Sequence, residues 1–563
     1  MAAAFSPEGA EAPNPEAMNF VSPVSVWPWR IWRTIWLAAV SYLVIEGIFR
    51  RFTLPQWPLL APDSAAYLLP AVNGGEYNIG PRMFVYPMFC RIVLAVSGDW
   101  RSISIVQHVL GLAGPVLLLG AWCLLGAQIW VSRVARAAHE TLGLALPLLL
   151  LPSATYVLYE QQVLLESFNA FLQCCLGGLL CVLWLPATPR RGLLLASATA
   201  ALGIFMYFAN PRWGGAMPTV VAFALLAAVL GRDHVRGWWR ALWPVLACSV
   251  AVYFGLGRIQ SSLVPPDPWL NTFTPKHLLW MHADLALNEF RQDLAAPQPP
   301  PYADLLRKMI PKVEKEIVGV GTSHWMTITF NAAALLYVAD CPDADLNAYF
   351  KGDPEGYRQF CLNYYLRIVR HQPRAYFGEV GRMLAYYYAG PQNDGAFREF
   401  SVAITDAFPG CASLARYLAG AGALPPERDL LLATAAEMEK PFLPPVILRP
   451  MPWYHEMIRR IHVFYLPVTL AGLAASVAIL AWPRLRDRRP LTVMAWLCLA
   501  SSTVLFAQVL TLAMVTVTEG RYADALRTLA AFSLVCALAA LVSLLVALIG
   551  LRRNPHPAPN VAG

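Results

Sequence analysis

The chain has 563 residues, of which 57% are apolar and 14% are charged. Soluble domains carry roughly 25% charged residues, so this composition excludes an ordinary soluble enzyme and is typical of a polytopic membrane protein. The formal net charge of +8 does not require a nucleic-acid partner, because most of the surplus lies in short arginine-rich loops between apolar segments.

Membrane spans are the main predicted elements. A span takes about 20 predominantly apolar residues. The sequence predicts roughly ten of them, at residues 33–50, 103–130, 141–159, 163–186, 192–209, 214–231, 240–258, 460–482, 491–518 and 524–551.

Every second short loop between these spans is rich in arginine. By the positive-inside rule, we expect these loops and both chain ends in the cytoplasm. The opposite side then receives most of the isolated charged residues and one long polar segment. The loop arginines are Arg133, Arg136, Arg190, Arg191, Arg232, Arg236, Arg240, Arg484, Arg486, Arg488, Arg489, Arg552 and Arg553.

These patterns predict an all-α polytopic membrane protein with about ten transmembrane helices and a large, mainly helical extracytoplasmic domain between the seventh and eighth. The expected parts are a disordered cytoplasmic tail (1–30), a transmembrane module (31–258) with an outer loop (51–102), the extracytoplasmic domain (259–458), C-terminal transmembrane helices (459–551) and a cytoplasmic tail (552–563).

Two features of the expected outer domain leave alternatives open. One disulfide among its three cysteines is plausible in an oxidising compartment, with the pairing undetermined. Lys276, His277 and His282 could line a cavity, but we interpret them as the solvated face of an amphipathic helix. No metal-spaced cluster of Cys and His is present in the sequence, so no metal site is predicted. The three cysteines are Cys341, Cys361 and Cys411.

An acidic residue, Asp63, follows the first span in the stretch Pro62-Asp63-Ser64-Ala65-Ala66-Tyr67. A carboxylate near the hydrocarbon boundary is costly unless it is solvated or paired. It could cap the N-terminus of a following helix. It could instead act as a general base that accepts the proton of an acceptor hydroxyl.

The order of several short motifs resembles the GT-C superfamily of integral-membrane glycosyltransferases, in particular the bacterial branch with aminoarabinose-to-lipid-A transferases and protein mannosyltransferase relatives. In Asn210-Pro211-Arg212 the order is Pro-Arg, whereas the family often has Arg-Pro. The other motifs are Asp63-Ser64-x-x-Tyr67, Gly80-Pro81-Arg82-x-x-x-Tyr86-Pro87, Tyr159-Glu160, Leu165-Glu166-Ser167 and Glu519-Gly520-Arg521-Tyr522.

The resemblance implies an inverting transferase in the bacterial inner membrane, with its active site facing the periplasm. It would move a sugar from a polyprenyl-phosphate carrier to a glycan, lipid or protein acceptor. Asp63 would be catalytic, and Arg82, Arg212 and Arg521 would bind the donor phosphate, because arginine makes bidentate phosphate contacts. Secondary polar roles would fall to Glu160, Glu166, Tyr67, Tyr86 and Glu519.

Alternatives remain for each of these roles. The arginines could anchor the protein at the lipid interface, and the acidic residues could make structural hydrogen bonds. The chain as a whole could be a transporter or flippase of a lipid-linked substrate, although that class predicts charges at the bilayer midplane and internal repeats. It could also be an O-antigen ligase or polymerase. A role for a divalent metal is left open.

Overall fold

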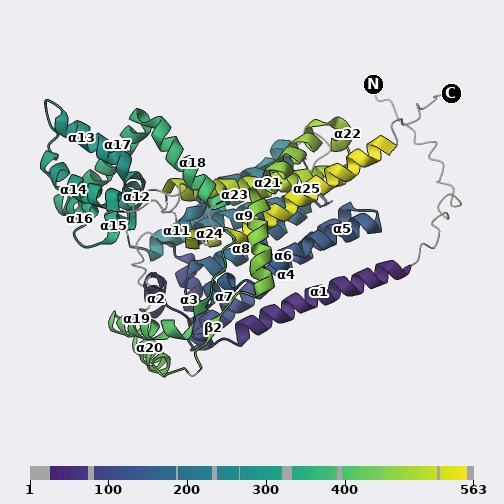
Figure 1. Cartoon of the computed structure of the whole chain (residues 1–563), viewed down its shortest axis with the longest axis horizontal. Coiled ribbons are helices and arrows are strands. Elements are labelled where there is room, and N and C mark those ends of the chain that lie inside the picture. Colours follow the sequence, from purple (N-terminus) through teal and green to yellow (C-terminus); the bar gives the residue numbers. More distant parts are fainter. Residues whose placement is uncertain are drawn as a thin grey trace.

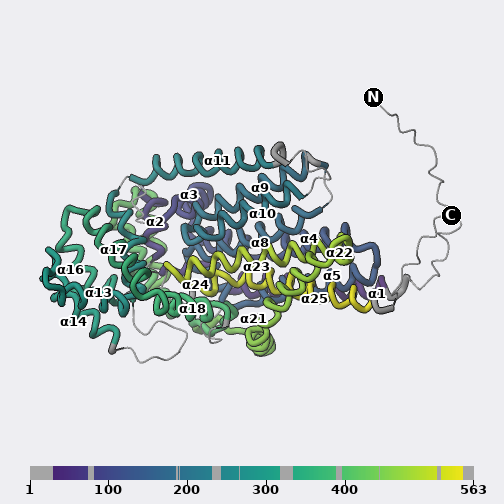
Figure 2. Tube along the Cα trace, turned by 90° about the horizontal axis from the view of Figure 1, so that it is seen from above, coloured from purple at the N-terminus to yellow at the C-terminus, as the bar shows by residue number. Residues whose placement is uncertain are grey.

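The computed structural model describes residues 26–61, 63–73, 82–185, 188–230, 238–265, 267–319, 332–389, 396–442, 444–515 and 520–553. Long helices run side by side along the longest axis of the molecule (Figure 1). A group of shorter helices lies at one end of this bundle. The start of α1 (Val26–Phe52) and the end of α25 (Arg527–Arg553) lie at the other (Figures 1 and 2).

Eight helices within the described residues are long and apolar enough to cross a membrane. This finding confirms the predicted all-α polytopic membrane architecture. They are α1 (Val26–Phe52), α4 (Arg101–Ile129), α8 (Leu165–Leu183), α9 (Pro189–Ala209), α11 (Trp238–Leu263), α21 (Pro452–Ala481), α23 (Arg489–Val515) and α25 (Arg527–Arg553).

The third predicted span is not a straight helix. It is divided into α5 (Arg133–Gly143), α6 (Ala145–Leu150) and α7 (Ala154–Gln161), with a bend of 55° before α7. Pro152 lies at the break and has no N–H to continue the helical ladder. Ser153 then caps α7 by accepting a hydrogen bond from the Tyr156 N–H. The result is a short buried helix, α7, set at an angle to the bundle.

The described part of the sixth predicted span is a short helix. Helix α10 (Ala216–Leu230) has 15 residues, fewer than the roughly 20 needed for a perpendicular crossing. It packs between α9, α11 and α23. Within the described residues, the ten predicted spans therefore correspond to eight long helices, one bent segment and the short apolar helix α10.

Two helices follow α1 in the loop 51–102, namely α2 (Ser64–Val72) and α3 (Val85–Ser97). They pack against each other, and α3 also packs on α4. Ile92 and Val96 of α3 are exposed. An exposed apolar edge on a short amphipathic helix is typical of a helix lying in the membrane interface.

Between α11 and α21 the chain forms a helical body and a separate hairpin. Aromatic rings form the core of the body, with the Phe290 and Tyr364 centroids 4.7 Å apart. The body comprises η4 (Pro268–Thr272), α12 (Phe273–Trp280), α13 (Ala283–Ala295), α14 (Ala303–Gly319), α15 (Ala332–Tyr337), α16 (Pro342–Tyr349) and α17 (Pro354–His371), and α18 (Pro373–Ala389) leads from it back to the bundle (Figure 1).

The hairpin consists of α19 (Phe408–Gly420) and α20 (Pro425–Met438), with η5 (Thr405–Ala407) before it. It packs on α2, and the Leu424 N–H donates to the Val72 carbonyl at 2.9 Å. The paired strands β1 (Val402–Ala403) and β2 (Ile447–Leu448) close its base. The remaining described helices are α22 (Pro483–Arg486) and α24 (Gly520–Asp524).

The disulfide that the sequence left open is not formed. Cys341, Cys361 and Cys411 are buried free thiols. Cys411 instead accepts a hydrogen bond at its Sγ from the Leu60 N–H, at 3.1 Å. This thiol therefore helps to hold the hairpin against the segment that follows α1.

Candidate functional site

Asp63 and Arg82 form an ion pair at one end of the bundle. Arg82 Nη2 donates to Asp63 Oδ1 at 2.7 Å, and the two side chains are 27% and 33% exposed. Asp63 directly precedes α2, yet its side chain makes no capping hydrogen bond to that helix. The capping alternative therefore does not describe this carboxylate, which is held by the arginine of the next motif.

Two tyrosines of the same motifs lie beside this pair. The Arg82 guanidinium is 5.1 Å from the Tyr67 ring centroid, a cation–π distance. Tyr67 meets Tyr86 edge to face at 5.0 Å, and the buried Tyr86 hydroxyl donates to Gln107 Oε1 at 2.8 Å. Burial raises the pKa of Tyr67, so its hydroxyl stays protonated. Tyr86 is thus a packing residue that supports Tyr67.

A second cation, Arg212, lies in η2 (Pro211–Gly214) between α9 and α10. Its guanidinium is 3.9 Å from the ring centroid of Tyr522 on α24. The backbone around it is fixed because the Arg212 N–H donates to Asn210 Oδ1 at 3.1 Å and Trp213 Nε1 donates to Asn169 Oδ1 at 2.7 Å. The reversed Pro-Arg order therefore still presents a guanidinium at this turn.

Arg212 lines a small polar pocket together with Glu166. Glu166 opens α8 and is 9% exposed. Tyr67 is within electrostatic range of Glu166, Arg82 and Arg212, so the Asp63–Arg82 pair and this pocket belong to one polar region. The pocket is lined by Glu166, Asn169, Asn210, Arg212, Gln508, Leu512, Tyr522, Ala525 and Leu526.

Helices α12 and α15 of the helical body extend the same region. His277 Nε2 accepts from the Tyr337 hydroxyl at 2.7 Å, while its Nδ1 donates to the Phe273 carbonyl at 2.7 Å. Burial lowers the pKa of His277 to about 4, which keeps the ring neutral. Tyr337 is within electrostatic range of Asp63 and Arg82. The interpretation of His277 as a solvated residue was therefore wrong.

His282 was also expected on a solvated face, and it is fully buried. Its Nδ1 lies 2.5 Å from Glu379 Oε2 of α18. Lys276 keeps partial exposure of 18% and lies 3.5 Å from Asp343. Helical periodicity alone could not predict that His277 and His282 are buried while Lys276 is partly exposed. The residues that contact these side chains come from helices distant in sequence.

Glu160 lies in a buried ion pair. Arg51 at the end of α1 donates to both of its oxygens, from Nε to Oε2 at 2.6 Å and from Nη2 to Oε1 at 2.7 Å. His108 Nδ1 is 2.9 Å from the same carboxylate. Arg51 and Glu160 are 0% and 1% exposed. This ion pair supports the alternative in which Glu160 has a structural role.

Sequence reasoning missed Arg51, although a signal was present. Arg50 and Arg51 follow the first span on the side that the positive-inside rule leaves poor in arginine. An arginine in that place needs a buried partner or a lipid headgroup. Of the remaining candidates, Glu519 lies outside the described residues, as does the side chain of Arg521.

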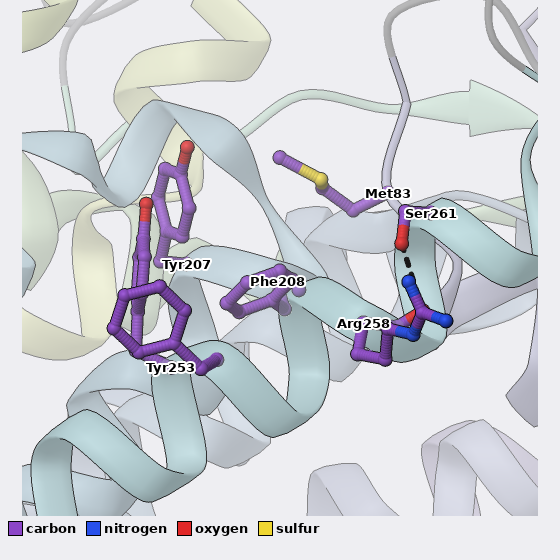
Figure 3. Close-up of a pocket in the computed structure, with 8 residues that line it drawn as sticks. Met83, Tyr207, Phe208, Tyr253, Arg258 and Ser261 are labelled. Atoms are coloured by element: carbon purple, nitrogen blue, oxygen red, sulfur yellow. Dashed lines mark hydrogen bonds between the residues drawn. The ribbon is translucent and has the colours of Figure 1, made fainter.

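An aromatic groove lies between α9 and α11 and reaches the residue that follows Arg82 (Figure 3). Its volume is about 340 Å³. Gln260 of α11 ties the groove to the Asp63–Arg82 loop, since its Oε1 accepts from the Phe84 N–H at 2.9 Å. The lining residues are Met83, Tyr207, Phe208, Tyr253, Phe254, Gly257, Arg258 and Ser261.

In the described part of the chain, no group of three or more His, Cys, Asp or Glu side chains could hold a metal ion. What these residues define is a multi-pass membrane protein with a carboxylate, two guanidiniums and an aromatic groove gathered at one end of its bundle. Such a region can bind an anionic group attached to an apolar chain.

No family model and no curated protein matches the chain. Among solved structures, it is similar to ArnT from Cupriavidus metallidurans bound to undecaprenyl phosphate, at 12% identity and a TM-score of 0.28, over 94% of this chain and 80% of that chain. ArnT is a GT-C glycosyltransferase, the superfamily that the sequence motifs resemble. At this identity and TM-score the similarity carries no argument about fold, superfamily or activity.

Proposed function

We propose that this protein transfers a sugar from a polyprenyl-phosphate carrier to an acceptor hydroxyl on an envelope glycan, lipid or protein. The observation that carries the proposal is the carboxylate of Asp63, paired with Arg82 in the same polar region as the Arg212 pocket. The proposal places the protein in the bacterial inner membrane. Residues 259–458 and the site would face the periplasm, and both chain ends would face the cytoplasm.

The donor would use the two cations and the groove together. Arg82 and Arg212 offer guanidiniums that suit the oxygens of a phosphate, and Arg521 is a third candidate by its motif. Met83 connects Arg82 to the aromatic groove between α9 and α11. An isoprenoid chain in this groove would therefore leave its phosphate at the level of Arg82.

In the proposed reaction, Asp63 accepts the proton of the acceptor hydroxyl. The acceptor oxygen forms a bond to the anomeric carbon on the face opposite the phosphate, which inverts that centre. The bond from the carbon to the phosphate oxygen breaks, and its electron pair leaves on the phosphate. Arg82 links the two events, because an arginine drawn to the donor phosphate releases the Asp63 carboxylate for proton transfer.

The test uses purified protein in nanodiscs with a sugar-loaded polyprenyl phosphate and a membrane extract as acceptor. Release of polyprenyl phosphate coupled to a new glycosylated product is expected. Arg82→Lys and Arg212→Lys should each weaken donor binding more than acceptor binding, and non-additively, because both cations would hold one phosphate. Movement of the intact lipid-linked sugar across a vesicle membrane without cleavage would instead identify a flippase.

A further inference from the structure

The chain that returns from the helical body is anchored beside the candidate site by two ion pairs, one part-buried and one fully buried. We call residues 396–400 the return segment; it follows α18 and precedes β1. Arg398 pairs with Asp524 of α24, and Glu399 pairs with Arg527 at the start of α25. Glu399 and Arg527 are both 0% exposed, so this anchor is enclosed by protein.

The Arg398–Asp524 pair is part of a three-residue cluster. Arg398 Nε donates to Asp524 Oδ2 at 2.6 Å, and the Tyr159 hydroxyl donates to the same oxygen at 2.7 Å. Arg398 Nη2 also donates to the Tyr159 oxygen at 3.1 Å. The cluster therefore joins the return segment, the buried helix α7 and the short helix α24.

The Arg527–Glu399 pair fixes the return segment itself. Arg527 Nη1 donates to Glu399 Oε1 at 2.5 Å, and its Nε donates to the Ala396 carbonyl at 3.0 Å. On the other side, the Ala154 N–H donates to Glu399 Oε2 at 2.9 Å. Arg398 is thus presented to Asp524 from a rigid backbone.

Helix α24 depends on such contacts for its position. It has five residues, too few for a helix to be stable by itself in isolation. Tyr522 of this helix lies under the Arg212 guanidinium, and Ala525 and Leu526 directly after it line the same pocket. A displacement of α24 would therefore move one wall of the pocket.

We propose that Arg398 and Asp524 are positioning residues, which hold α24 so that Tyr522 stays beneath Arg212 in the small polar pocket. The pocket's occupant, a polyprenyl phosphate, rests on the proposed function. The positioning itself does not, because it concerns only how α24 is held. The chain returning from the helical body thereby sets the geometry of a site built mainly by the transmembrane bundle.

The test compares Asp524→Asn, Arg398→Gln and Arg398→Lys with wild type in nanodiscs. Tyr159→Phe serves as a milder variant, because it removes one hydroxyl and keeps the ring. The control is Arg416→Gln, which breaks an exposed pair with Glu439 on the hairpin, where the side chains are 48% and 44% exposed. Hydrogen exchange of residues 520–526 and the affinity for undecaprenyl phosphate are measured in each.

We expect amide exchange in 520–526 at least tenfold faster, and binding of undecaprenyl phosphate at least fivefold weaker, in Asp524→Asn and Arg398→Gln. Arg398→Lys should recover part of both, and Arg416→Gln should match wild type. Unchanged exchange in folded Asp524→Asn and Tyr159→Phe would overturn the proposal. Faster exchange with unchanged lipid affinity would support the positioning of α24 and would overturn the part of the proposal that places the lipid phosphate in this pocket. If wild type binds no polyprenyl phosphate, the proposed function fails, and the exchange result still decides whether these residues position α24.

Discussion

Arg82 holds Asp63 through a hydrogen bond of 2.7 Å between residues 19 positions apart. The contact brings together two motifs of the loop 51–102 and occupies one oxygen of the carboxylate. An ion pair of this kind keeps the carboxylate in place until a stronger anion competes for the guanidinium. Under the proposed function, donor binding and activation of Asp63 are therefore coupled through Arg82.

The buried pair of Arg51 and Glu160 predicts a stability defect upon mutation. Glu160→Gln leaves the Arg51 guanidinium uncompensated in a fully buried place, a change that costs about 3–5 kcal/mol. We expect poor recovery of folded protein and a lower melting temperature in detergent. Arg101→Gln is the control, because its pair with Asp99 is exposed and such pairs contribute about 0–1 kcal/mol. A Glu160→Gln protein with normal stability but no activity would instead indicate that Glu160 takes part in the reaction.

The aromatic groove predicts a dependence on lipid chain length. Gly257 lines it, and a Cβ there would lie 3.7 Å from Phe208, so Gly257→Leu can be accommodated while its side chain fills the groove. Excluding part of an isoprenoid chain should cost about 1–2 kcal/mol at roughly 25 cal/mol per Å².

We therefore expect KM for a long polyprenyl donor to rise about tenfold in Gly257→Leu, with little change for a short-chain donor. Gly255→Leu on the same helix is the matched control, since a Cβ there meets no atom within 4 Å. Equal effects of the two variants on KM would show that the groove does not bind the donor.

The helical body should show a pH-dependent stability centred on Asp284. Burial and the neighbouring Glu379 raise the pKa of Asp284 to about 7. The pKa of an aspartate in the unfolded chain is about 3.9. Between about pH 3.9 and 7 the folded state therefore binds more protons than the unfolded state. The free energy of unfolding falls as pH rises across this interval. Burial lowers the pKa of His282 to about 4, which acts in the opposite sense below about pH 6.5.

His277 and His282 titrate near pH 6.5 in the unfolded chain and oppose this fall, so the contribution of Asp284 is measured as a difference. As pH rises from about 5 to about 8, the melting temperature of wild type should fall relative to that of Asp284→Asn. Asp284→Asn removes the contribution of the Asp284 proton. It leaves the rise in stability with pH that the two buried histidines produce between about pH 4 and 6.5. Asp304→Asn is the control, because Asp304 is 96% exposed. A slope in Asp284→Asn equal to that of wild type would contradict the assignment.

Topology is tested by reporter fusions at Gly390 and Gly563. The arginine-rich loops predict that Gly390 is periplasmic and Gly563 cytoplasmic. Alkaline phosphatase activity is expected at the first position and fluorescence of a cytoplasmic reporter at the second. Cytoplasmic activity at Gly390 would reverse the proposed orientation of the site.

Local sequence patterns predicted the long helices well, because an apolar run of about 20 residues has few alternatives in a membrane. They missed the break before α7, although Pro152 and Ser153 carried the signals of a helix end and a helix start. The predicted start of the sixth span, residue 214, lies in η2, and α10 begins at Ala216, because hydropathy does not locate the first residue of a helix.

Residues of the candidate site could be predicted from the sequence only where they belong to one of the short motifs. Asp63, Arg82 and Arg212 fall in one polar region, as their motifs suggested. The partners Arg398 and Asp524 lie 126 positions apart, and no local pattern relates residues so distant. Tertiary packing likewise decided that Glu160 meets Arg51.

The most direct test of the central claim is the Asp63→Asn variant in a strain that lacks the wild-type protein. Envelope glycans, lipids and polyprenyl-linked sugars are measured by mass spectrometry, with wild type and Asp304→Asn as comparisons. The account predicts that Asp63→Asn is expressed normally, lowers the glycosylated product at least 100-fold and lets the sugar-loaded carrier accumulate. Product at the wild-type level from Asp63→Asn would contradict it.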